Sequence, residues 1–256
     1  DITSEQVVKS YLHRIKALND KLHAFIFIDE KKAIDNAIAI DKLINSGVDL
    51  GPLMGLPVAI KDICSVNGMP TTNGSIVESD DLTGKEGKLV KRLKELGCVI
   101  IGKTHTVEFA LGATGLNKHR GTPWNPWDLK THRIPGGSSS GSAVAIASGL
   151  APFTIGTDTG GSVRIPASLT GIAGLKTTKD VWPTDGIFPL SPTLDTPGPL
   201  ARSFEDIKTI FETYGSGLTK NLDPISIGTL KLGKLGKPFS DDLDAEVHFA
   251  FEKICE

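Results

Sequence analysis

Apolar residues along this chain follow two periods that alternate. Residues 1–20 carry the helical period, with apolar side chains at Val7, Val8, Tyr11, Leu12, Ile15 and Leu18. Short uninterrupted apolar runs that end near glycine, such as 57–63 and 98–103, instead favour buried strands. The alternation of amphipathic helices with buried strands predicts an α/β protein.

The same pattern predicts six helices and five strands. The helices are expected at 4–19, 30–46, 86–96, 140–149, 203–214 and 241–254, and the strands at 57–63, 98–103, 152–157, 172–176 and 225–230. Thr3 with Gln6 and Ser203 with Asp206 are typical of helix N-terminal caps. We expect a mixed, largely parallel sheet flanked by helices on both faces. Because no repeat or low-complexity linker divides the chain, we expect a single domain over 1–256.

Composition narrows the class of protein. The chain has 256 residues, of which 39% are hydrophobic and 23% charged, enough for one large core. A net charge of −2 gives no basic field for nucleic acid, and the apolar runs are too short to span a membrane. The three cysteines (Cys64, Cys98 and Cys255) form no metal motif and suit a reducing compartment. We therefore expect a cytoplasmic protein whose partner is a small molecule, with no cofactor, and leave a homodimer open.

Two Gly-Gly-Ser sequences carry the candidate chemistry. They end at Ser138 and Ser162, 24 residues apart, and an Ala-rich apolar run joins them. Paired glycines allow positive φ and bring bare N–H groups close to a ligand. The second loop predicts a nest for an oxyanion, formed by the N–H groups of Thr159, Gly160, Gly161 and Ser162. The pattern favours nucleophilic catalysis at a serine.

Charged residues flank the second loop. Asp158 and Arg164 predict an ion pair that holds the loop, with substrate binding by the same two side chains as the alternative. Phosphate binding is disfavoured because neither loop contains GxxxxGK[ST] or GxGxxG.

A serine nucleophile needs a base, and Lys61 is the best candidate. It lies within the apolar run 57–63, where a lysine must either extend to solvent or lose its proton. Ser–Lys pairs are an established variant of the catalytic triad. Among the six histidines only His105 follows an apolar strand, and no GxSxG elbow surrounds either serine. Cys64 is better interpreted as a small buried residue than as a nucleophile.

At this point the chain resembles a known family. The segment GGSSSGSAVAIASGLAPFTIGTDTGGSVRIPA is similar to the amidase signature, including the spacing of its two serines and its closing SVRIPA. Four flanking segments are similar as well, at 51–62, 122–128, 171–176 and 188–199, so that the resemblance covers roughly residues 1–256. Members of that family are usually longer, which predicts a domain that is incomplete on its C-terminal side.

The resemblance implies an amidase-signature fold and a Ser–Ser–Lys triad. Ser162 would be the nucleophile, Lys61 the base, and Ser138 the bridging serine after a cis peptide bond from Gly137. Ser139 would hydrogen-bond within the same network. The implied activity is hydrolysis of a carboxylic amide to an acid and ammonia or an amine, through an acyl-enzyme. One alternative is the glutaminase-type component, of the A type, of a glutamyl-tRNA amidotransferase, and a catalytically silent binding or scaffold protein is another.

Overall fold

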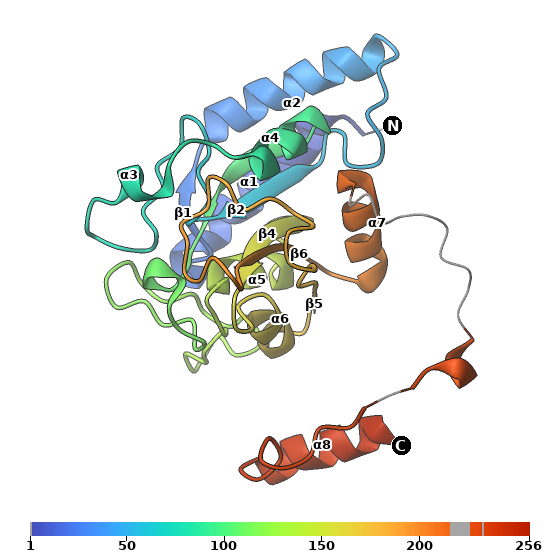
Figure 1. Cartoon of the computed structure of the whole chain (residues 1–256). Helices are drawn as coiled ribbons and strands as arrows, with labels where there is room; N and C mark the ends of the chain where they lie inside the picture. The colour runs from blue at the N-terminus through green and yellow to red at the C-terminus, as the bar shows by residue number, and fades with distance from the viewer. Residues whose placement is uncertain (1, 216–225, 232) are drawn as a thin grey trace. The chain divides into compact units, whose positions relative to one another are not determined.

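The computed structural model describes residues 2–215, 226–231 and 233–256, and contacts divide the chain into the units Asp1–Ser216 and Gly217–Glu256. The first unit contains a six-stranded sheet in the order β1-β3-β2-β4-β6-β5 (Figure 1). Its strands are β1 (Phe25–Ile28), β2 (Pro57–Lys61), β3 (Val99–Thr104), β4 (Phe153–Asp158), β5 (Ala173–Gly174) and β6 (Thr196–Ala201). The central pairs β3–β2 and β2–β4 are parallel, and the outer pairs are antiparallel. The predicted mixed α/β fold is confirmed.

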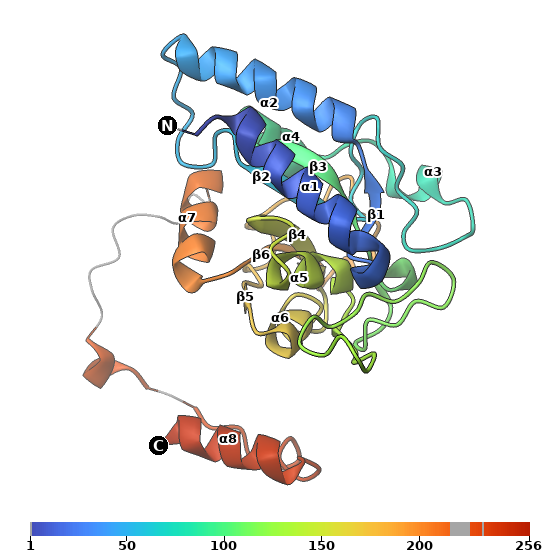
Figure 2. The same cartoon turned by 180° about the vertical axis from the view of Figure 1, so that it is seen from behind.

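Helices cover both faces of this sheet, because successive strand residues face opposite ways. One core joins Ala59 of β2 to α1 (Ser4–Leu22), α2 (Glu30–Asn45), α5 (Ser140–Ala147) and α6 (Arg164–Thr170). Figure 2 shows α1, α5 and α6 in front of the sheet. The other core joins Val58 and Ile60 to α4 (Lys88–Glu95) and α7 (Phe204–Tyr214). Two short turns of helix, α3 (Asp80–Thr83) and η1 (Glu108–Ala110), lie in the connections.

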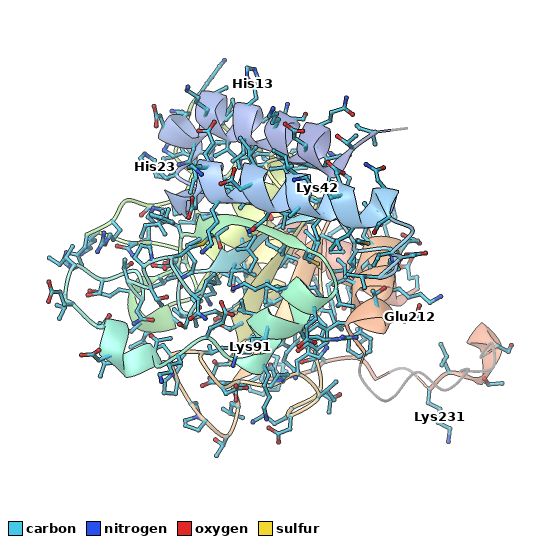
Figure 3. The ribbon with its side chains drawn as sticks, turned by 90° about the horizontal axis from the view of Figure 1, so that it is seen from above. His13, His23, Lys42, Lys91, Glu212 and Lys231 are labelled. Atoms are coloured by element: carbon cyan, nitrogen blue, oxygen red, sulfur yellow. The ribbon has the colours of Figure 1, made fainter. Side chains whose placement is uncertain are left out.

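Local sequence explains where the long helices begin. At the start of α1 the Thr3 hydroxyl accepts the Gln6 N–H at 3.2 Å, and the Gln6 side chain accepts the Thr3 N–H at 3.0 Å. Ser203 and Asp206 form the same reciprocal cap at the start of α7, so both predicted caps are confirmed. The outer surface of α1 is polar, and His13 lies on it (Figure 3). No helix of the described residues is long and apolar enough to cross a membrane.

The structure departs from the predicted elements in three places. Within 226–230 the described chain forms a short 3-10 helix, Ile227–Thr229, instead of the strand expected at 225–230, and residue 225 lies outside the described residues. Strand β6 was not expected, because Pro197 and Pro199 lack the N–H that a central strand donates. Helix α6 was missed for a related reason, since Pro166 disguises a first helical turn in which proline is tolerated. The second unit contains α8 (Ala245–Cys255), near the expected 241–254.

Candidate active site

The ends of two neighbouring parallel strands bring the predicted catalytic residues together. Lys61 is the last residue of β2, and Asp158 is the last residue of β4. Because parallel strands end at the same edge of a sheet, the loop after β4, which carries Ser162, begins beside Lys61. The loop that leads into α5 supplies Ser138 at the same edge. Sites in open α/β sheets form at such carboxyl ends.

The Lys61 amine is fully buried, with only hydroxyl partners. Its Nζ lies 2.8 Å from Ser138 Oγ and 2.8 Å from Thr157 Oγ1. Among residues 2–215, 226–231 and 233–256 no carboxylate lies within ion-pair distance of it. Burial lowers the pKa of Lys61 to about 7, although the more distant Cys64, Asp158 and Asp195 act in the opposite direction. The side chain is therefore poised between ammonium and neutral amine near neutral pH.

Ser138 is held by its backbone as well as by Lys61. The Gly137–Ser138 peptide bond is cis, as the resemblance implies. The Ser138 carbonyl accepts the Val107 N–H at 3.2 Å, and the Gly137 N–H donates to the Ala113 carbonyl at 2.7 Å. A Cβ atom at residue 137 would lie only 2.7 Å from the Gly115 nitrogen, so this close approach requires glycine. Segment 107–115 thus fixes the position of the Ser138 hydroxyl.

The two serine loops are joined through their main chains. The Ser139 N–H donates to the Ser162 carbonyl at 3.1 Å, and the Ser139 hydroxyl bonds the Thr157 backbone at 3.2 Å. Ser139 therefore supports the residue that receives the Lys61 amine, rather than the amine itself. The hydroxyls of Ser138 and Ser162 share no hydrogen bond among the described residues, so the structure shows the lysine side of the expected relay and not the nucleophile side. Ser138 is buried, whereas Ser162 is half-buried.

Asp158 organises the loop that carries Ser162. Its carboxylate accepts from Arg164 Nε at 3.0 Å and Nη2 at 2.9 Å, and from the N–H groups of Gly161, Val163 and Arg164. Burial pushes the pKa of Asp158 upward, but the hydrogen bonds from Arg164 and the backbone outweigh it and hold the pKa below its ordinary value. Asp158 and Arg164 thus form an ion pair that folds the loop around a carboxylate.

The same contacts change the expected nest of amides. The Gly161 N–H donates to Asp158 Oδ1 at 2.8 Å, so in this arrangement it does not face the open side of the loop. Gly161 has a φ of +125°, a region that favours glycine. Within the described chain no acceptor lies against the N–H groups of Thr159, Gly160 and Ser162. The oxyanion nest drawn from the sequence therefore loses one of its four amides here.

Two side chains of the site were not among the predicted residues. Thr157 supplies the second hydroxyl at the Lys61 amine. Asp195 accepts the Thr159 hydroxyl at 2.5 Å and the N–H groups of Leu190 and Ser191 at 3.0 Å, which ties the loop to the start of β6. Both lie in quoted motifs, since Thr157 immediately precedes Asp158 and Asp195 falls within 188–199. Their polar character in apolar surroundings was the available signal.

The alternative bases and nucleophiles do not reach this site. Burial lowers the pKa of His105 to about 4, and in the described residues no hydrogen bond joins its ring to Ser138 or Ser162. The other five histidines are exposed, among them His23 on the outer side of α1 (Figure 3). Burial raises the pKa of Cys64 to about 11, which disfavours the thiolate that a nucleophile needs. The interpretation of Cys64 as a buried apolar residue agrees with these surroundings.

Cavity size does not mark this site. A cavity of about 280 Å³ lies at the opposite ends of β2 and β4, where Leu56 and Pro152 precede the strands. A much smaller cavity, of about 10 Å³, lies beside the serine loop, with Thr157, Thr159 and Asp195 in its wall and Phe188 on its apolar side. The site is defined by converging polar groups rather than by volume.

Comparison with known proteins agrees with this geometry. A family model described as Amidase matches residues 6–226. The 2-amino-5-chloromuconic acid deaminase of Comamonas testosteroni is 42% identical over 259 residues, covering 100% of this chain and 56% of the deaminase. The A-type component of the glutamyl-tRNA(Gln) amidotransferase of Acidothermus cellulolyticus is 43% identical over 206 residues, covering 80% of this chain and 40% of that protein.

One solved structure, described as a crystal structure of amidase, superimposes on this chain with a TM-score of 0.81 at 38% identity. The superposition covers 88% of this chain and 50% of that one. The chain thus spans about half the length of the proteins that it matches.

Proposed function

The chain belongs to the amidase family, and we propose that it hydrolyses a carboxylic amide through a serine acyl-enzyme. The observation that carries this proposal is the Lys61 amine. It is fully buried, its partners are hydroxyl groups, and burial lowers its pKa to about 7. A neutral amine in that position can accept the proton that a serine must lose when it attacks a carbonyl carbon.

The proposed reaction begins with proton transfer along the serines. Ser162 Oγ attacks the amide carbonyl while its proton passes to Ser138 and the Ser138 proton passes to Lys61. The Ser162 and Ser138 hydroxyls must first approach each other, and such catalytic contacts often tighten only when substrate binds. The N–H groups of Thr159, Gly160 and Ser162 would receive the oxyanion, and an N–H donor in such a hole contributes about 10²–10³ in rate.

The leaving nitrogen then takes the proton back. Lys61 returns it through Ser138 to the departing nitrogen, because an unprotonated amide nitrogen leaves poorly. Water, activated by the same pair, hydrolyses the ester formed on Ser162, and the acid is released. A small carboxamide is the proposed substrate class. Similarity to an enzyme named as the deaminase of a small organic acid is compatible with ammonia as the second product.

A second candidate function is glutamine hydrolysis within a larger assembly. The observation that favours it is the 43% identity to the A-type component of a glutamyl-tRNA(Gln) amidotransferase. The same lysine and serines would hydrolyse glutamine, and the ammonia would pass to partner proteins. Hydrolysis of free glutamine by the isolated chain, compared with a panel of small carboxamides, distinguishes the two candidates.

A fluorophosphonate probe followed by peptide mapping tests the proposed nucleophile. We expect covalent label on Ser162 in the wild type and none after Ser162→Ala. Ser168→Ala is the matched control, because Ser168 is an exposed serine on α6 a few residues away. Label on Ser138 or Cys64 with none on Ser162 would contradict the assignment.

A further inference from the structure

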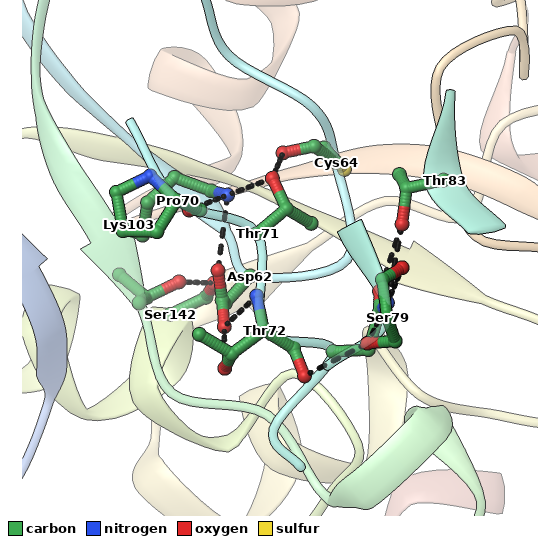
Figure 4. Close-up of polar contacts among 11 residues, drawn as sticks. Asp62, Cys64, Pro70, Thr71, Thr72, Ser79, Thr83, Lys103 and Ser142 are labelled. Carbon is green, nitrogen blue, oxygen red and sulfur yellow. Dashed lines mark hydrogen bonds and ion pairs between the residues drawn. The ribbon is translucent and has the colours of Figure 1, made fainter. Parts of the chain in front are cut away.

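A second lysine is fully buried next to the catalytic strand, and the proposed mechanism does not use it. Lys103 belongs to β3, which pairs with β2, and its side chain is 0% exposed. Its Nζ donates to the Pro70 carbonyl at 3.0 Å and to Thr71 Oγ1 at 2.9 Å. It also lies 3.0 Å from Asp62 Oδ1, in an ion pair that is not aligned as a hydrogen bond (Figure 4). Lys103 is thus an ammonium whose three N–H groups each have an acceptor nearby.

Asp62 is held as firmly as its partner. Its other oxygen, Oδ2, accepts from the Thr72 N–H at 3.1 Å and from the Thr72 hydroxyl at 2.5 Å (Figure 4). The Asp62 N–H donates to the Thr104 carbonyl, and the Asn73 N–H donates to the Asp62 carbonyl, both at 3.0 Å. Because Asp62 directly follows Lys61, these contacts fix the end of the strand from which the Lys61 side chain extends.

An irregularity in the sheet brings the two charges together. The parallel register between β2 and β3 shifts between Val58 and Ala59, and beyond the shift Lys103 lies opposite Ile60. Asp62 stands two residues after Ile60, and so on the same side of the strand, whereas Lys61 points the other way. Bulges of this kind redirect a side chain beside an active site. Without the shift, Gly102 would take the place opposite Ile60.

The location of this pair has an electrostatic consequence for Lys61. A buried carboxylate in the adjacent residue would favour the ammonium form of Lys61, and a buried ammonium on the next strand would favour the neutral amine. We propose that the Lys103–Asp62 ion pair acts as a positioning pair for Lys61, anchoring its strand end and cancelling the charge beside its amine. This inference rests on the proposed function, in which Lys61 must release its proton near neutral pH.

Other charged groups near Lys61 leave this role to the pair. Asp158 is neutralised by Arg164, and Asp195 is bonded by Thr159 and two backbone amides. Cys64 is a buried thiol, and α5, which packs on β2, carries no charged side chain. Among the ion pairs of the described residues, Lys103 with Asp62 is the pair in which both side chains are 0% exposed. Solvent therefore screens its charges least.

Lysine titration followed by NMR tests the inference without relying on turnover. The full chain, labelled with ¹³C at the lysine ε carbon, is titrated between pH 5 and 11, and the Lys61 signal is assigned by its loss in Lys61→Ala. We expect Lys103→Met to raise the Lys61 midpoint by about half a pH unit or more, and Asp62→Asn to lower it by a similar amount. The double variant should return to within about 0.3 pH unit of the wild type.

The outcomes separate this inference from the proposed function. Lys31→Met is the matched control, since it removes an exposed lysine from an ion pair with Asp35, and it should leave the midpoint unchanged. Midpoints that stay fixed, or that move the same way in both single variants, overturn the pair's role. If Lys103→Met does not fold, the Asp62→Asn and double variants carry the same test. Absence of fluorophosphonate label on Ser162 in the wild type would instead reject the proposed catalysis, whatever the Lys61 midpoint does.

Discussion

Lys61 and Lys103 lie on adjacent central strands of one sheet, and neither side chain is exposed, yet their amines have different partners. Lys61 meets the hydroxyls of Ser138 and Thr157, whereas Lys103 meets a carboxylate, a carbonyl and a hydroxyl. Burial alone penalises the charge on both. Only Lys103 has a buried anion to offset that penalty, so burial displaces the charge at Lys61 and retains it at Lys103. The partner decides which buried lysine can serve as a base.

The sharpest way to break this comparison is to remove the Lys61 amine. We expect Lys61→Ala to lower kcat for an amide substrate by roughly 10⁴, because no other described group near Ser138 can take the proton. The wild type should lose activity as the pH falls through about 7, where Lys61 becomes protonated. Steady-state kinetics between pH 5 and 9 measure both effects.

The control for that substitution is Lys31→Ala, which should leave kcat unchanged because Lys31 is exposed on α2. Circular dichroism of each variant checks that the fold is intact. Near-normal turnover in Lys61→Ala, or a profile that stays flat below pH 7, would show that Lys61 is not the base.

The next largest effect is expected where Lys61 hands on its proton. Ser138→Ala should lower amide hydrolysis by roughly 10²–10³ and ester hydrolysis of the same acyl group by less. The difference arises because an amide nitrogen must be protonated to depart and an alkoxide need not be. Parallel kinetics on a matched amide and ester measure the ratio, and Ser168→Ala serves as the exposed-serine control. Equal losses for both substrates would argue against a proton relay through Ser138.

The sequence located the main groups of the site because they lie in contiguous motifs. Lys61 in an apolar run and two Gly-Gly-Ser loops are local features, and local patterning also placed most helices and the three central strands. The family resemblance then added the cis bond before Ser138, which composition and periodicity alone do not predict.

Features that depend on register and rotamer were beyond the sequence. The donation from the Gly161 N–H to Asp158 requires a particular loop conformation, and the Thr157 contact to Lys61 requires the pairing of β2 with β4. The shift that places Lys103 beside Asp62 is an irregularity of one residue, which no hydrophobic pattern reveals. The prolines of β6 concealed a strand whose neighbours supply its hydrogen bonds.

The comparison also predicts opposite signs for two stability changes. Burial lowers the pKa of Lys61 from 10.5 to about 7, so between those values the unfolded chain binds more protons and stability rises with pH. Lys61→Met removes that dependence, and its free energy of unfolding relative to wild type should fall by about 2–3 kcal/mol between pH 6 and pH 9. Lys103→Met instead leaves Asp62 unpaired, and should destabilise the fold by about 3 kcal/mol.

Urea denaturation of the two variants and the wild type at pH 6 and pH 9 measures these differences. Lys31→Met is the control for loss of a lysine from an exposed pair, and should change stability by less than about 1 kcal/mol. A Lys61→Met variant with the same pH dependence as wild type would mean that Lys61 keeps its proton in the folded state.

The smallest expected effect comes from a pair that resembles Lys103 with Asp62 but is open to solvent. Asp158 is 0% exposed, whereas the Arg164 side chain is 54% exposed. Arg164→Leu leaves the three backbone N–H donors to Asp158 in place, so the loop should keep its conformation, and kcat/KM should fall only about three- to tenfold. Arg133→Leu is the matched control, because Arg133 pairs with Asp128 at the surface and should give no loss. A loss above about 100-fold would place Arg164 in direct contact with the substrate, the alternative role that its position after Ser162 also allows. A loss no greater than that of Arg133→Leu would show that the backbone donors alone hold the loop, and that a countercharge matters to this site only where water cannot replace it.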